Sequence, residues 1–231
     1  MLFLDIDLDF FLSKNAYFSG TAGIRLGRIY KPWSVANVKY FLENRCGLSI
    51  DVPVKGRIID THDGIINFWH TLIDSGELTV PFGVTHVDAH PDLLIGGGIH
   101  LTSDLLRINS GLINATLKNK HIHSGNYLTF AIAYGWVGSL LWVFLRRNYI
   151  GPLGWDGDAR SISVQINERR PPLQDSSEVE TERVIPFMAL PWQSFVTKKR
   201  FNYIVLSRSP DFTPPESDRL VSVIEMYMKI I

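Results

Sequence analysis

Aspartate and histidine gather in short stretches of this sequence, each next to an apolar run. The first stretch is Leu4-Asp5-Ile6-Asp7-Leu8-Asp9, in which a carboxylate recurs at every second residue. Because the side chains of a strand alternate between its two faces, this spacing directs all three carboxylates to one face. The surrounding apolar residues predict burial, and buried carboxylates need cations. The stretch therefore predicts a metal or catalytic site rather than a row of solvated acids.

A second stretch places one histidine between two aspartates. It reads Val87-Asp88-Ala89-His90-Pro91-Asp92 and begins where the apolar run 83–87 ends. A strand that passes into a turn here would direct Asp88, His90 and Asp92 to one point in front of the sheet. Carboxylate oxygens with one imidazole favour Mn²⁺ over a zinc site built from sulfur. The alternative is a structural turn in which Asp88 caps local amides.

Two further stretches have the same form. In the first, His62 follows the predicted strand 57–60 and is a candidate ligand, with Asp60 or Asp63 as its hydrogen-bonding neighbour or as a helix cap. In the second, Asp211 follows the apolar run 203–206. It is either an ordinary turn residue or an acid that receives a cationic substrate.

The composition is that of an ordinary folded protein. The chain has 231 residues, 45% of them hydrophobic and 20% charged, which argues against disorder. Its 23 basic and 23 acidic side chains cancel, which removes the bulk electrostatic basis for binding nucleic acid or an anionic membrane. A lone cysteine, Cys46, forms no intrachain disulfide, and the apolar stretch 127–145 is glycine-interrupted and near the lower length limit for a membrane span. We expect a soluble cytoplasmic protein.

The pattern of apolar runs predicts an α/β fold. Strands are expected at 2–8, 57–60, 83–87, 139–145 and 203–206, and helices at 34–43, 65–74, 126–135 and 216–229. Alternating strands and helices indicate a mostly parallel sheet, with ligands bound beyond the carboxyl ends of its strands. The polar segment 167–183 is expected to be an exposed loop, and Trp136, Trp142 and Phe144 are expected in the core. The length predicts a single domain over 1–231.

These motifs resemble the metal site of a known enzyme superfamily. Asp-Ala-His-Pro-Asp at 88–92, Asp-Leu-Asp at 7–9 and a separate histidine resemble the ureohydrolases, the arginase and agmatinase superfamily. The longer blocks Asp-Ile-Asp-Leu-Asp-Phe-Phe and His-Val-Asp-Ala-His-Pro-Asp-Leu are similar to an atypical branch of it. That branch includes peptide arginases of the OspR type, which convert arginine to ornithine in ribosomally made peptides. Ser-Gly-Asn-Tyr at 124–127 and Ser-Arg-Ser-Pro-Asp-Phe at 207–212 are also similar to this branch.

The resemblance implies a three-layer αβα fold, two Mn²⁺ ions per subunit and a hydroxide between the ions as nucleophile. Asp88 and Asp7 would bridge the ions, and each ion would be completed by one histidine and one further aspartate, His62 with Asp92 and His90 with Asp9. Asp5 is the alternative ligand if the register of the first strand is shifted by two. The products would be ornithine and urea.

The same resemblance suggests catalytic and substrate-binding residues. His100 is the nearest match to the family's proton-carrying histidine, with His123 as the competing candidate. Asn126 is assigned to substrate binding, and Asp211 is assigned both to substrate binding and to catalysis, in place of the family's guanidinium-binding glutamate. The usual arginase substrate loop is absent after Asp92, so the expected substrate is an arginine-containing precursor peptide.

One departure and three alternatives remain. In ordinary arginases the Asp-x-Asp strand follows the Asp-Ala-His block, whereas here it comes first, so we expect a rewired strand order, with 207–212 considered as the last strand. The alternatives are a free-arginine or agmatine hydrolase, a deacetylase-like amidohydrolase with one zinc ion, and a non-enzymatic binding module. The sequence indicates no oligomeric state.

Overall fold

The structure is a computed structural model that describes residues 1–16, 23–94, 122–146, 161–168 and 179–231. Its helices are α1 (Val35–Tyr40), α2 (Gly64–Asp74), α4 (Tyr127–Ala133) and α5 (Asp218–Glu225), with a π-helical turn at Phe41–Arg45 and 3₁₀ turns at Leu8–Phe11, Pro210–Phe212 and Pro215–Ser217. The strands are β1 (Leu2–Asp7), β2 (Val54–Ile59), β3 (Phe82–Val87), β4 (Val137–Phe144), β5 (Ser161–Glu168), β6 (Val179–Pro191), β7 (Tyr203–Ser207) and β8 (Met228–Ile230).

All eight strands of the described segments form one sheet, in the order β5-β6-β4-β3-β1-β7-β2-β8. Every neighbouring pair is parallel except β5 with β6, which is antiparallel. Strand β1 lies inside the sheet, between β3 and β7. The alternation of strands and helices therefore produced the mostly parallel α/β sheet that the sequence predicts.

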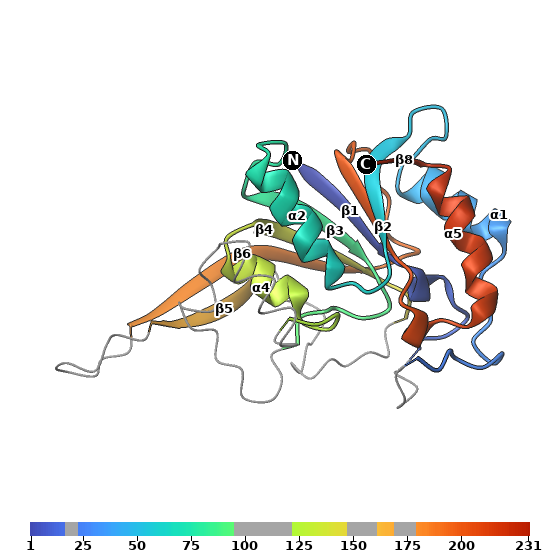
Figure 1. The fold of residues 1–231 in the computed structure, drawn as a ribbon, viewed down its shortest axis with the longest axis horizontal. Coiled ribbons are helices and arrows are strands. Elements are labelled where there is room, and N and C mark those ends of the chain that lie inside the picture. Colours follow the sequence, from blue (N-terminus) through green and yellow to red (C-terminus); the bar gives the residue numbers. More distant parts are fainter. Residues whose placement is uncertain (17–22, 95–121, 147–160, 169–178) are drawn as a thin grey trace.

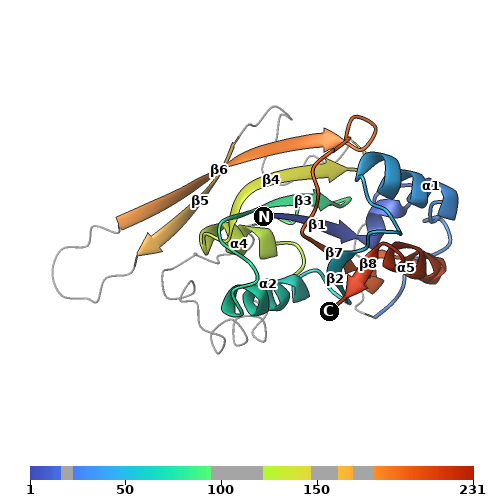
Figure 2. The same ribbon diagram turned by 90° about the horizontal axis from the view of Figure 1, so that it is seen from above.

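Helices cover both faces of the sheet, so the fold has three layers (Figures 1 and 2). On one face, Trp69 of α2 and Leu128 of α4 belong to the same apolar core as Phe3 of β1. On the other face, Val38 of α1 and Leu220 of α5 share a core with Leu4. Alternate residues of β1 thus enter different cores, as the two-residue repeat of a strand requires.

The order of the strands opens a crevice beside β1. From β1 the chain runs by way of α1 to β2, beyond β7, whereas from the adjacent β3 it runs by way of α4 to β4, on the other side. The connections that follow β1 and β3 therefore leave neighbouring strand ends in opposite directions, and their helices α1 and α4 lie on opposite faces of the sheet. Such a switch point is where open parallel sheets bind ligands.

Several predicted elements have different bounds in the structure. The first strand ends at Asp7, and Asp9 lies in a 3₁₀ turn, because Asp7 Oδ1 accepts a hydrogen bond from Asp9 N and so caps that turn. The predicted helix 216–229 ends at Glu225, since Met228–Ile230 instead pair with the edge of β2. Strand β7 ends at Ser207 and is followed by β8, so 207–212 is not the last strand.

The polar segment 167–183 is also not one exposed loop. Its two ends belong to β5 and β6, which form an antiparallel ladder from Ser161↔Pro186 to Glu168↔Val179. Main-chain hydrogen bonds sustain such an edge ladder even where the sequence is polar. The middle of the segment, 169–178, lies outside the described residues. Trp136, Trp142 and Phe144 are buried as predicted.

We predict that Gly56→Ala destabilises the protein by about 1–3 kcal/mol, because overpacking a tight site has costs of this size. A Cβ at Gly56 would lie 2.2 Å from the main-chain oxygen of Ile204 on β7 and 2.9 Å from Met228 Cε. Urea unfolding measures the change. Gly27→Ala is the matched control, since nothing lies within 4 Å of the added atom. Equal unfolding midpoints for the two variants would contradict the close packing of β2 against β7.

Candidate metal centre

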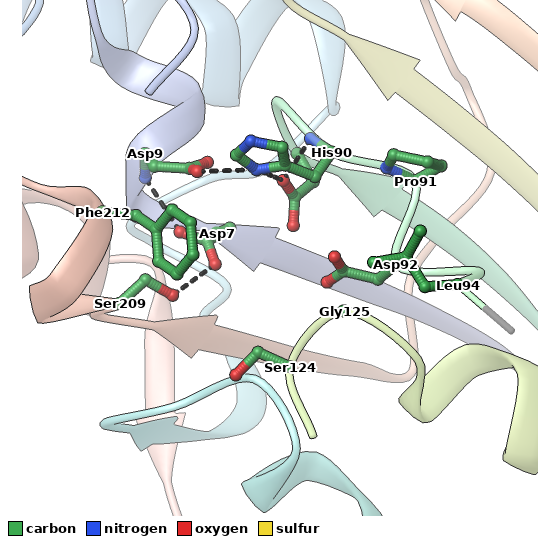
Figure 3. A pocket seen from close by; sticks show the side chains of 11 residues that line it. Asp7, Asp9, His90, Pro91, Asp92, Leu94, Ser124, Gly125, Ser209 and Phe212 are labelled. Carbon is green, nitrogen blue, oxygen red and sulfur yellow. Dashed lines mark hydrogen bonds and ion pairs between the residues drawn. The ribbon is translucent and has the colours of Figure 1, made fainter. Parts of the chain in front are cut away.

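The six predicted ligands lie together at the carboxyl ends of three strands. Asp7 is the last residue of β1 and Asp9 follows it, His62 lies between β2 and α2, and the other three follow β3. A pocket at this edge of the sheet is lined by Asp7, Asp9, Asp88, His90, Pro91, Asp92, Leu94, Ser124, Gly125, Ser209 and Phe212 (Figure 3). His62 is fully buried behind this lining. The convergence of strand ends that the sequence predicts is present in the fold.

Three carboxylates surround one nitrogen of His62. His62 Nδ1 lies 3.1 Å from Asp7 Oδ2, 3.1 Å from Asp88 Oδ2 and 3.0 Å from Asp92 Oδ2. The nitrogen is buried and makes no hydrogen bond with any of them. We call Asp7, His62, Asp88 and Asp92 the His62 group.

A second histidine has a similar arrangement beside it. His90 Nδ1 lies 3.0 Å from Asp9 Oδ2 and 3.5 Å from Asp88 Oδ1, while His90 Nε2 lies 2.8 Å from the main-chain oxygen of Ala16. Nε2 therefore donates a hydrogen bond to the main-chain oxygen of Ala16, so the neutral form of His90 directs its Nδ1 lone pair at the carboxylates. Figure 3 shows the carboxylate of Asp9 and the imidazole of His90 pointing toward each other as direct neighbours. We call Asp9, Asp88 and His90 the His90 group.

Asp88 belongs to both groups, with one oxygen directed at each histidine. Two hydrogen bonds fix its position: His90 N donates to Asp88 Oδ1 at 2.6 Å, and the side-chain Nε1 of Trp142 donates to the main-chain oxygen of Asp88 at 3.0 Å. Asp7 contacts His62 through Oδ2, and its Oδ1 accepts from Asp9 N, so its polar contacts reach the main chain of the His90 group. Asp88 is thus the side chain that joins the two groups.

Three carboxylate oxygens around one ring nitrogen suit metal coordination better than hydrogen bonding, because that nitrogen carries at most one hydrogen. Ligand atoms that hold one ion at about 2.1 Å and at right angles to each other lie about 3 Å apart, which matches the separations around His62 Nδ1. Asp9 Oδ1 is a further buried oxygen without a hydrogen-bond partner. The donors are oxygen and nitrogen, and Cys46 is buried in the core on the α1 face. The described residues therefore fit divalent metal ions, and could hold more than one.

The pKa shifts of the site also indicate a need for bound positive charge. Burial and the carboxylates of Asp7 and Asp88 raise the pKa of Asp9 well above its ordinary value. Burial and Asp88 also raise the pKa of Asp92 to about 7. Burial opposes protonation of His62 and His90, but Asp5 and Asp9 respectively outweigh it and raise the pKa of both imidazoles well above the usual range. Protons and metal ions therefore compete for the same ligand atoms of the cluster.

The sequence assigned no role to His86 or Tyr127, and it gave Asp5 only as an alternative ligand. Asp5 accepts hydrogen bonds from His62 Nε2 at 2.8 Å and from Tyr127 Oη at 2.5 Å, and it lies 3.1 Å from His86 Nδ1. The signal for Asp5 and His86 was present, because each lies two residues before a predicted ligand on the same strand face. Tyr127 comes from α4 and has no comparable local signal.

The other predicted site residues lie outside the cluster or outside the described residues. His100 lies outside the described residues. Asn126 is buried and its Oδ1 accepts from His123 N at 2.8 Å, so it stabilises the turn that presents Ser124 and Gly125 to the pocket. Asp211 does not line the pocket, and its Oδ1 accepts from Gly23 N at 2.9 Å. The structure therefore does not bring Asn126 or Asp211 into the cluster.

The other candidates near His62 and α4 are also outside the cluster. His123 is exposed, and its Nδ1 accepts a hydrogen bond from Gly125 N at 3.2 Å. Asp63 occupies the position before α2 without capping it, and accepts from Ser124 Oγ at 3.1 Å. Asp60 is largely exposed and pairs with Arg208. None of these three side chains lines the pocket.

Two pocket residues have strained main chains. Asp92 has φ of 49° and Ser209 has φ of 41°, and they are the two non-glycine residues with positive φ among those described. The Ser209 hydroxyl donates to Asp7 Oδ2, so the strained turn after β7 directs a hydrogen bond at a ligand of the His62 group (Figure 3). Strain of this kind is typical of functional sites, where the surrounding structure sustains it.

Comparison with known proteins gives no family. No family model matches the chain, and a search of curated proteins finds no match either. None of the helices in the described segments is both long and apolar enough to cross a membrane. The fold and the pocket together define an α/β protein with buried clusters of Asp and His that could hold metal ions.

We predict that Mn²⁺ affinity falls as the pH is lowered from about 8 to about 6, a range that begins above the ordinary imidazole pKa. Both imidazoles must lose a proton from Nδ1 to bind an ion, and their raised pKa values mean that protons compete even above that ordinary value. Calorimetric titration in buffers of different ionisation enthalpy measures the affinity and the protons released. A constant affinity without proton release would contradict the assignment of His62 and His90 as ligands.

Proposed function

We propose that the chain is a binuclear manganese hydrolase that cleaves the guanidinium of arginine side chains in a peptide, giving ornithine and urea. The observation that carries the proposal is the position of Asp88, with one oxygen directed at the histidine of each group. A carboxylate shared in this way is suited to bridge two ions. The motif resemblance to ureohydrolases supplies the reaction and the choice of Mn²⁺.

The charge balance supports two ions rather than one. The described pocket and its surroundings bury five carboxylates, those of Asp5, Asp7, Asp9, Asp88 and Asp92. Both nitrogens of His86 face acceptors, Asp5 Oδ2 at 3.1 Å and the main-chain oxygen of His90 at 3.0 Å, so an imidazolium that donates from both nitrogens would satisfy them. Two divalent ions and this imidazolium would balance the five carboxylates. A single zinc ion would leave two negative charges buried, which is costly.

The lining of the pocket suits an arginine side chain. Two divalent ions, when bound, supply a nucleophile at neutral pH by lowering the pKa of water. Pro91, Leu94 and Phe212 offer apolar surface for the methylene groups of the side chain.

The same lining favours a peptide over the free amino acid. No lysine or arginine is found among the described residues that line the pocket. The α-carboxylate of free arginine would therefore find no cationic side chain among these residues, whereas an arginine inside a peptide has no such charge. His100 as the proton carrier and Asp211 as a contact to the substrate remain predictions from the sequence.

Urea release tests this function. Manganese-loaded protein is given a peptide with an internal arginine, and in parallel free arginine, agmatine and a peptide with acetylated lysine. We expect urea from the first peptide, at a rate that falls by at least about a hundredfold in Asp88→Asn, because the residue shared by the two groups is altered. Asp74→Asn, at the exposed end of α2, is the control that keeps the native rate. Urea must be measured directly, because loss of CH₂N₂ and loss of an acetyl group share a nominal mass.

The other substrates discriminate the alternatives. Faster urea release from free arginine or agmatine than from the peptide would identify a small-molecule ureohydrolase. Bound metal with acetate release and no urea would favour the deacetylase-like amidohydrolase. Bound metal with no product from any substrate would favour the binding module.

A further inference from the structure

A second set of polar side chains lies outside the lining of the pocket. Asp5, His62, His86 and Tyr127 are fully buried and come from β1, the loop after β2, β3 and α4. Asp5 is at the centre, with Oδ1 bonded to His62 and Oδ2 to Tyr127 and His86. We call Asp5, His86 and Tyr127 the supporting triad. Its members are absent from the lining of the pocket.

Asp5 decides which nitrogen of His62 faces the pocket. A neutral imidazole has one N–H donor and one lone pair. Because Asp5 Oδ1 lies 2.8 Å from His62 Nε2, the proton is on Nε2 and the lone pair is on Nδ1, the atom that three pocket carboxylates surround. Histidine ligands in metal sites commonly donate their other N–H to a carboxylate in this way.

Tyr127 holds both Asp5 and His62. Its hydroxyl donates to Asp5 Oδ2 at 2.5 Å, and its ring lies over the imidazole of His62, with ring centroids 4.8 Å apart and planes 30° apart. One side chain thus restricts the carboxylate and covers one face of the imidazole. Rotation of His62 would break the bond to Asp5 and the ring contact together.

His86 connects this support to the other group. Its Nδ1 lies 3.1 Å from Asp5 Oδ2, and its Nε2 lies 3.0 Å from the main-chain oxygen of His90. The loop that carries His90 is therefore linked through one imidazole to the carboxylate that orients His62. Both histidines of the pocket depend on contacts made by the same buried residues.

We propose that Asp5, His86 and Tyr127 are positioning residues that set the metal affinity of the pocket without contacting an ion. The proposal rests on the metal-binding part of the function above and is independent of the substrate. It assigns to Asp5 the orientation and tautomer of His62, to Tyr127 the restraint of Asp5, and to His86 the link between the two groups.

Titration of metal-free protein with Mn²⁺ tests the proposal, with calorimetry for affinity and electron paramagnetic resonance for unbound ion. We expect Asp5→Asn to bind Mn²⁺ about 10- to 100-fold more weakly and Tyr127→Phe about tenfold more weakly, the range found when such outer residues are altered. Tyr134→Phe, at the end of α4, is the control that keeps the native affinity. Tyr127→Phe keeps the ring, so it decides the question if Asp5→Asn does not fold.

Thermal unfolding separates positioning from a purely structural role. A positioning role reduces the rise in melting temperature that Mn²⁺ produces, because that rise depends on affinity. Native affinity in both variants, with melting temperatures lowered equally with and without Mn²⁺, would overturn the proposal. Native protein that binds no Mn²⁺ would overturn both proposals, whereas binding without urea release would overturn only the proposed reaction.

Discussion

The burial of five carboxylates at one edge of a parallel sheet is the constraint on which this structure depends. Bringing such groups out of water is costly unless positive charge accompanies them. The protein supplies histidines and main-chain donors, but most of these are already engaged in holding the carboxylates in place. The positive charge that is still needed would have to lie where the ligand atoms converge, within 4.8 Å of one another in each group of three.

Strands and loops have different roles in bringing these ligands together. Strand β1 lies between β3 and β7 and is buried on both faces, so its end is a rigid platform for Asp7. The loops after β2 and β3 add His62 and Asp88 from either side of that platform. Each loop follows a paired strand, and this anchoring positions the side chains at the common edge of the sheet.

Much of this was predictable from local patterns, and the failures have physical causes. The two-residue repeat of Asp5 and Asp7 predicted a common strand face, and the predicted ligands did converge. Asp9 departed from the strand because a carboxylate two residues earlier accepts its main-chain N–H and starts a turn. The contact of Tyr127 with Asp5 was not predicted, since it joins residues 122 positions apart. The helix predicted over 216–229 was cut short because Met228 gains a strand partner in Val54.

The alternation along β1 also limits how this protein can change. Phe3 packs under α2, Leu4 and Ile6 pack under α1 and α5, and the carboxylates of Asp5 and Asp7 occupy the face that Phe3 begins. Inserting or deleting a single residue within this strand would exchange the two faces, sending acids into one core and Leu4 and Ile6 toward the pocket. Variation in length among descendants of this sequence is therefore confined to the segments between strands, while the strand itself can change only by substitution.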